Sequence, residues 1–200
     1  SGKLYAQIQN GAPFDVFLSA DMARPERLVA ESVALGETLR VYALGRLLLW
    51  RPESGAAGGR SELNSSPGPG WLSKTRSRHV ALANPELAPY GQASREVLEG
   101  LNLIDEVRAR MVFGENIGQT YTMVATGNAT VGFIARAQLP ASDPLDGTVW
   151  EIPLALYSPI EQGVVQLSRA KENAAATAFV AYLASDVAKE FIRKAGYEVE

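Results

Sequence analysis

Two turns that lead into expected helices are the places where this sequence could do chemistry. Residues 84–101, NPELAPYGQASREVLEGL, follow the apolar run 80–83, pass through a proline-rich turn and enter an amphipathic pattern near Tyr90. The first backbone N–H groups of a helix have no partner within the helix, and together with the helix dipole they attract an anion. An ordinary strand–turn–helix connection has the same pattern, so this stretch alone leaves both interpretations open.

The second such turn is VFGENIGQT, residues 112–120, where Asn116 is a good N-cap and Ile117 begins a helix. The first residues, SGKLY, predict one more helix start with Ser1 as its cap. Residues 84–92 and 112–120 contain no Arg or Lys, so an anion there would be held by N–H dipoles. Helix starts without catalytic groups predict a protein that holds an anion and does not transform it.

Motifs for other chemistry are absent from the sequence. There is no GxGxxG, no GxxxxGK[ST] and no GxSxG, and the chain has one His and no Cys. An enzyme would have to rely on Ser19 or His79, which fit a turn residue and a histidine at a strand end better. We therefore expect no catalytic residues, no metal site and no resident cofactor.

Composition excludes some partners. The 200 residues carry a formal net charge of -3, which gives no electrostatic basis for binding nucleic acid. No apolar run reaches the roughly 20 residues that a membrane span needs. The lack of Cys is consistent with an oxidising compartment such as the periplasm.

Hydrophobic patterns alternate between strands and helices, which predicts an α/β fold with mostly parallel sheets flanked by helices. In such sheets, ligands bind at the carboxyl ends of the strands. Gly45 divides a long apolar segment, and residues 51–77 are rich in Gly and Pro and predict a long surface loop with a short helical turn at most. Residues 140–147 predict a further loop. The expected strands are 15–19, 39–50, 80–83, 111–113, 131–135, 149–153 and 163–167, and the expected helices are 3–10, 26–32, 91–101, 104–108, 117–126, 172–183 and 186–195.

Several segments together resemble the molybdate-binding receptors of bacterial ABC transporters. The most specific are NGAPFDVFLSAD and NPELAPYG, and RVYALGRLLLW, ENIGQT and VGFIARAQL extend the resemblance along nearly the whole chain. The resemblance implies a periplasmic, two-lobed binding protein of the second topological type, with its ligand cleft between the lobes. It implies a molybdate or tungstate ion held there without water by serine hydroxyls and backbone N–H groups, then delivered to a membrane permease.

Carried over by position, the resemblance assigns the binding serine to Ser1 and backbone donors to Tyr90 and Ile117. Ala135 stands where some members have a tyrosine hydroxyl. Two strands are expected to cross between the lobes, one bent at Gly45 and one entering at residues 158–159. We therefore expect lobe I to be 1–44 with 158–200 and lobe II to be 45–157. Family members begin with a strand, a helix and a strand before the serine, so lobe I is expected to be incomplete at its N-terminus, with unpaired strand edges. The complete protein is expected to be monomeric.

A second function remains open from the sequence. The effector domain of a transcription regulator can share the two-lobed architecture, so an anion-sensing domain is the alternative to a transport receptor.

Overall fold

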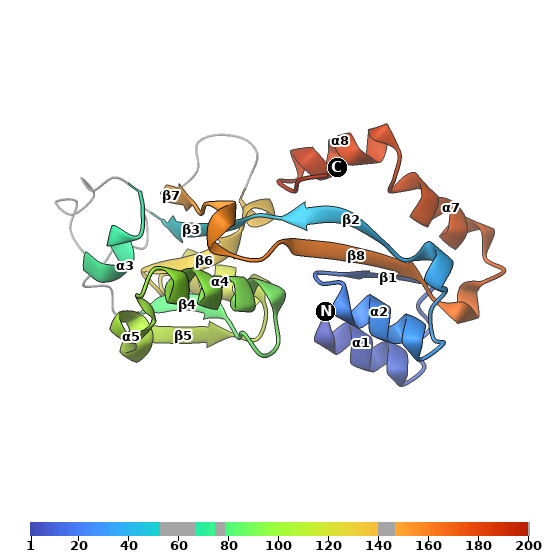
Figure 1. Ribbon diagram of the computed structural model, residues 1–200, viewed down its shortest axis with the longest axis horizontal. Coiled ribbons are helices and arrows are strands. Elements are labelled where there is room, and N and C mark those ends of the chain that lie inside the picture. The colour runs from blue at the N-terminus through green and yellow to red at the C-terminus, as the bar shows by residue number, and fades with distance from the viewer. Residues whose placement is uncertain (53–66, 75–78, 140–146, 200) are drawn as a thin grey trace. The chain divides into compact units, whose positions relative to one another are not determined.

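The computed structural model describes residues 1–52, 67–74, 79–139 and 147–199 (Figure 1). Contacts divide the chain into two compact units, each with its own sheet: unit 1 is Ser1–Gly45 with Ile160–Glu200, and unit 2 is Arg46–Pro159. The sequence analysis expected these divisions after residues 44 and 157. Among the described residues, no helix is both long enough and apolar enough to cross a bilayer.

Unit 1 is built on an antiparallel sheet whose described strands lie in the order β1-β8-β2. Its strands are β1 (Val16–Ser19), β2 (Arg40–Gly45) and β8 (Ile160–Gln166). Its helices are α1 (Gly2–Gln9), α2 (Ala23–Ala30), α7 (Ala174–Tyr182) and α8 (Asp186–Lys194). Helices α1 and α2 cover one face of the sheet and α7 and α8 the other (Figure 1).

The two faces of unit 1 follow from alternation along β8. Val165 packs with Phe17 and Leu28 in the cluster beneath α1 and α2. The preceding residue, Val164, points to the opposite face and packs with Val180 of α7. One central strand therefore supplies both hydrophobic cores of this unit.

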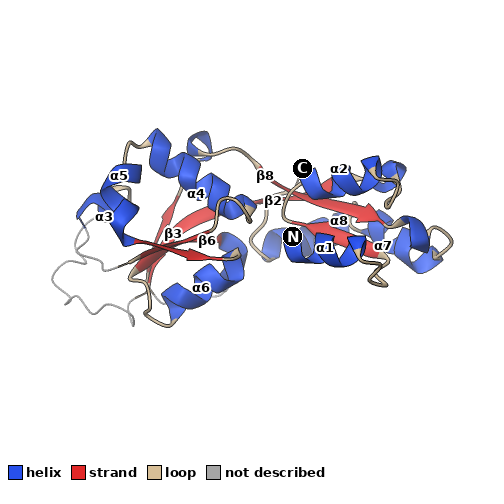
Figure 2. Cartoon of the chain, turned by 90° about the horizontal axis from the view of Figure 1, so that it is seen from below, coloured by secondary structure: helices blue, strands red, loops and turns tan. Residues whose placement is uncertain are grey.

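Unit 2 is built on a mixed sheet whose described strands lie in the order β5-β4-β6-β3-β7. Its strands are β3 (Leu47–Arg51), β4 (Val80–Ala83), β5 (Met111–Gly114), β6 (Val131–Ala135) and β7 (Thr148–Glu151). Its helices are α3 (Gly70–Lys74), α4 (Pro89–Gly100), α5 (Ile104–Val107) and α6 (Ile117–Ala125). Helices α4 and α6 lie on opposite faces of the sheet (Figure 2).

Aromatic packing fixes α6 on its face of the sheet in unit 2. Trp50 of β3 is 4% exposed, and its ring stacks on Tyr121 of α6 with 5.3 Å between ring centroids. Leu48, on the same strand as Trp50, and Ile134 of the neighbouring strand β6 belong to the same cluster. Trp50 therefore lies in the core of unit 2, whereas Phe14 of unit 1 is 37% exposed.

The α/β class is confirmed, but the mostly parallel arrangement is wrong. Among the described strands, β4 is parallel to β5 and to β6, and the other pairs are antiparallel. A parallel pair needs a crossover of a dozen or more residues. Helices α4 and α5 provide one between β4 and β5, and α6 lies between β5 and β6. The alternation of elements predicted the crossovers, but it carries no signal for the direction of strands that pair across long stretches of sequence.

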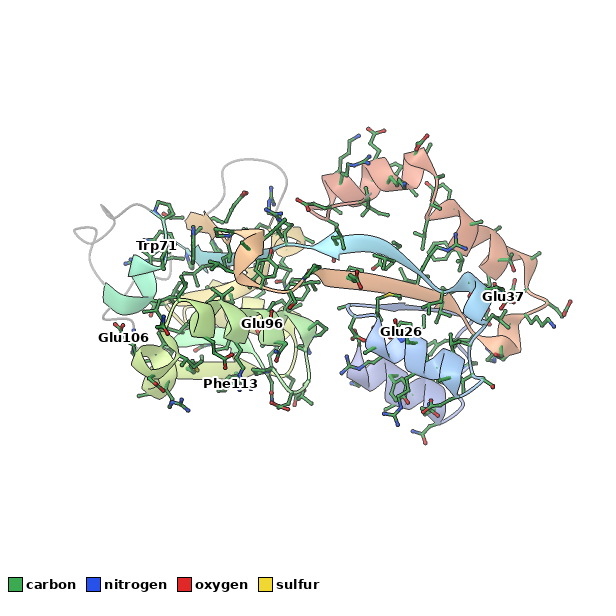
Figure 3. All side chains as sticks on the ribbon, viewed as in Figure 1. Glu26, Glu37, Trp71, Glu96, Glu106 and Phe113 are labelled. Carbon is green, nitrogen blue, oxygen red and sulfur yellow. The ribbon has the colours of Figure 1, made fainter. Side chains whose placement is uncertain are left out.

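Two local predictions also need correction. Helix α2 begins at Ala23 and not at residue 26, because the Asp21 carboxylate accepts the Arg24 N–H at 2.8 Å and stabilises an earlier first turn. The loop expected over 51–77 lies largely outside the described residues, as does the loop expected over 140–147 apart from Gly147. The described part of residues 51–77 includes α3, a helix of 5 residues, which fits the short helical turn that was allowed there. Trp71 of α3, labelled in Figure 3, is only 3% exposed, so the expected surface location is wrong at this residue.

Candidate functional site

The start of α4 is fixed by its own backbone. Strand β4 ends at Ala83, and the N-cap residue Ala88 is extended, with φ −134° and ψ 131°. The Ala88 carbonyl accepts the N–H groups of Gly91 at 2.9 Å and Gln92 at 3.1 Å. Pro89 occupies the first helical position, which it favours because its missing N–H has no helical partner there. Tyr90 is the second residue of the helix, so its backbone lies in the first turn, and its side chain is buried.

Gly91 lets this helix start sit directly on the end of β4. A β-carbon at Gly91 would fall inside van der Waals contact of the Ala83 carbonyl oxygen and the Asn84 backbone. Only glycine allows this close approach without displacing the helix or the strand. The depth of the first turn of α4 against the sheet is therefore set by one residue.

The start of α6 carries a well-formed N-cap, as predicted. Asn116 is extended, with φ −151° and ψ 171°, and its side-chain oxygen accepts the Gln119 N–H at 2.9 Å. The Gln119 side chain in turn accepts the Glu115 N–H at 2.6 Å. Within the described part of the chain, the N–H groups of Ile117 and Gly118 have no acceptor. Two polarised donors at this helix start are thus available to a ligand.

The two helix starts of unit 2 lie at the same edge of the sheet. Strands β4 and β5 are parallel neighbours, and their last residues, Ala83 and Gly114, face each other in the register. Just beyond them, the Asn84 N–H donates to the Gly114 carbonyl at 2.7 Å. Neither first turn contains an acidic residue, and neither contains Arg or Lys. This edge can therefore hold an anion through backbone dipoles without a paired cation.

Sequence reasoning missed one residue at this edge, Gln138. Its amide nitrogen donates to the Ile117 carbonyl at 2.9 Å, and its amide oxygen accepts the Ala135 N–H, also at 2.9 Å. A single side chain therefore joins the end of β6 to the first turn of α6. The only local signal was a glutamine three residues after a strand end, where it can bond back to the backbone.

In unit 1, Ser1 precedes α1, but its hydroxyl does not cap that helix as expected. Its oxygen instead accepts the Ala20 N–H at 2.8 Å, directly after β1. The hydroxyl proton stays available for donation to a ligand, because this bond uses only a lone pair. The Arg24 guanidinium lies beside Gly2 and pairs with the Asp21 carboxylate, so an ion pair lies next to this helix start.

The two residues considered for an enzyme, Ser19 and His79, lie in different units. Ser19 belongs to unit 1, where its buried oxygen accepts the Asp21 N–H at 3.4 Å. His79 belongs to unit 2, is exposed, and lies just before β4. The described residues include no group of three or more His, Cys, Asp or Glu side chains placed to hold a metal ion.

Comparison with known proteins shows which family the chain belongs to. Residues 1–198 match the family described as bacterial extracellular solute-binding protein. The chain belongs to this family. Members of such a family bind solutes, which agrees with a site made of fixed donors.

This solute-binding protein has named relatives along its whole length. It is 40% identical over 200 residues to the molybdate-binding protein ModA of Rhodobacter capsulatus, covering 100% of this chain and 75% of that relative. Its structure is similar to that of the Azotobacter vinelandii periplasmic molybdate-binding protein, with a TM-score of 0.89, 37% identity, and coverage of 100% and 84% of the two chains. It is also similar to the substrate binding domain of a putative molybdenum ABC transporter from Clostridium difficile, with a TM-score of 0.73, 27% identity, and coverage of 100% and 83%.

Proposed function

We propose that this protein binds molybdate or tungstate outside the cytoplasm and delivers it to the membrane permease of an ABC transporter. The observation that carries the proposal is the pair of helix starts at one edge of the unit 2 sheet, with N–H donors and no basic residue in either first turn. The names of the relatives support the choice of anion, and family membership supports a transport receptor over the effector domain of a transcription regulator.

In this proposal, each residue donates and none exchanges protons or electrons with the ligand. The backbone N–H groups of Tyr90 and Ile117, together with that of Gly118, point the positive ends of α4 and α6 at the anion. Ser1, which the resemblance assigns as a donor, has a hydroxyl proton left for a ligand, because its oxygen accepts the Ala20 N–H. Hydrogen bonds to a charged group are individually strong, so a few fixed donors suffice for tight binding.

Selectivity in this scheme comes from size. The donors sit on a rigid frame, because Gly91 packs against the end of β4 and Asn116 caps α6. Such a frame cannot contract around a smaller tetrahedral dianion such as sulfate, so sulfate would leave some donors unpaired. The first turns of α4 and α6 contain no Arg or Lys, whose charge would attract every dianion alike.

Melting temperatures in the presence of different anions test the proposal. A ligand that binds only the folded protein stabilises it by about 2.7 kcal/mol at a hundredfold excess over its Kd. Molybdate and tungstate should therefore raise the melting temperature, and equimolar sulfate or phosphate should not. Equal shifts with all of these anions would contradict selection by size, and no shift with molybdate or tungstate would contradict the function.

A further inference from the structure

We propose that Gln138 is a positioning residue for the anion donors of α6, an inference that rests on the proposed function of this edge. Gln138 does not belong to either helix start. Its two ends bond to the Ala135 N–H and to the Ile117 carbonyl, so it links the end of β6 to the first turn of α6. The role is to hold and polarise the peptide group whose N–H faces the ligand.

The backbone turn that carries Gln138 is held in place on both sides. Ala135 is 3% exposed and Leu139 is 6% exposed, so the backbone on both sides of the short turn 136–138 is buried. The Arg136 N–H donates to the Arg46 carbonyl at 2.9 Å, which ties the turn to the start of β3. The glutamine side chain thus reaches α6 from a rigid base, and its bond restricts where the first turn can move.

The bond also changes the donor strength of the next residue. Ile117 contributes the carbonyl, and Gly118 contributes the N–H, of the same peptide group. A hydrogen bond donated to the carbonyl draws electron density toward oxygen and makes the N–H of that group a better donor. The Gly118 N–H is one of the two at this helix start without an acceptor among the described residues.

Glutamine is suited to this position because its two ends differ. One bond needs a donor and the other needs an acceptor, and an amide supplies both. A glutamate could accept from Ala135 but could not donate to the Ile117 carbonyl. A methionine of similar length could do neither. These two substitutions therefore separate the acceptor end of the side chain from the donor end.

The test measures molybdate binding by calorimetry for the whole chain and for Gln138→Met, with Gln9→Met as the matched control. Gln9 is an exposed residue at the end of α1 in unit 1, where its amide donates to the Tyr5 hydroxyl at 3.0 Å. Loss of one net hydrogen bond predicts an affinity about three- to tenfold weaker for Gln138→Met. The control should bind like the unsubstituted chain. Equal affinity for the Gln138→Met variant and the unsubstituted chain would overturn the inference.

The amide proton resonance of Gly118 in ligand-free protein gives a readout that a general loss of packing would not move selectively. We expect this resonance to shift upfield in Gln138→Met and in Gln138→Glu, which keeps the bond to Ala135 and guards against a folding defect. An unshifted Gly118 resonance in a folded variant would overturn the positioning role. If the unsubstituted chain binds no molybdate, the proposed function fails, while the Gly118 resonance still decides whether Gln138 polarises this peptide group.

Discussion

Replacing Ile117 with proline removes one backbone donor from the candidate site and leaves the helix able to form. Ile117 is the first residue of α6, where proline is well tolerated, and its N–H has no acceptor among the described residues. Proline also requires an extended residue before it, and Asn116 already has φ −151° and ψ 171°. A hydrogen bond to a charged group is worth about 1.5–3 kcal/mol, so molybdate affinity should fall by about ten- to hundredfold.

Calorimetric titration of the proline and alanine variants separates the backbone from the side chain. Ile117→Ala keeps the N–H and removes only part of a half-buried side chain, so it should bind molybdate nearly as well as the unsubstituted chain. Circular dichroism checks that both variants are folded. If the alanine variant loses as much affinity as the proline variant, the side chain holds the anion and the backbone-donor reasoning is refuted.

Further predictions concern the frame around the site and the core of unit 1. Gly91→Ala should lower the free energy of unfolding by at least about 1–3 kcal/mol in urea titrations, because its methyl group overlaps the end of β4. Gly100→Ala on the same helix adds a β-carbon with no atom from another described part of the chain within 4 Å, so it should raise the free energy of unfolding by about 0.4–1 kcal/mol. Equal changes for the Gly91 and Gly100 variants would contradict the close approach of Gly91 to β4. Asn116→Ala should lower the free energy of unfolding by about 1 kcal/mol, because it removes the N-cap bond from the Gln119 N–H. An unchanged urea midpoint would contradict a stabilising role for that bond. Burial, and to a smaller extent Tyr197, raises the pKa of Tyr42 from 10.0 to about 12. The unfolded chain releases this proton first, so the associated stability is complete below pH 10 and about 2–3 kcal/mol is lost by pH 12. Tyr42→Phe should flatten that part of the pH profile of stability.

The Asn116 cap was predictable because it is local: its side chain accepts an N–H three residues further on, within one short stretch of sequence. The turns before Tyr90 and Ile117 were predictable for the same reason. The cap expected of Ser1 is wrong because its hydroxyl bonds to Ala20 instead. Apolar runs then predicted most strands to within two or three residues, since burial on both faces of a sheet leaves a continuous apolar segment.

Contacts between distant segments were not predictable from these patterns. Strand β8 pairs with β1, which lies more than 140 residues earlier in the chain, and no local pattern specifies that pairing or its direction. The Ser1 hydroxyl bonds to Ala20 and the Gln138 amide to Ile117, so neither role can be seen in the flanking residues. The need for glycine at position 91 was not predicted, because it comes from the carbonyl of the preceding strand, which only the packed structure shows.

The most direct test of an anion held by backbone dipoles is the amide proton spectrum during a titration with molybdate. A hydrogen bond to the dianion deshields the proton that donates it, so the amide resonances of Tyr90, Ile117 and Gly118 should move downfield together and saturate at one molybdate per chain. Sulfate at the same concentrations should leave them in place. Molybdate-dependent shifts confined to residues outside the first turns of α4 and α6 would contradict the assignment of the anion site.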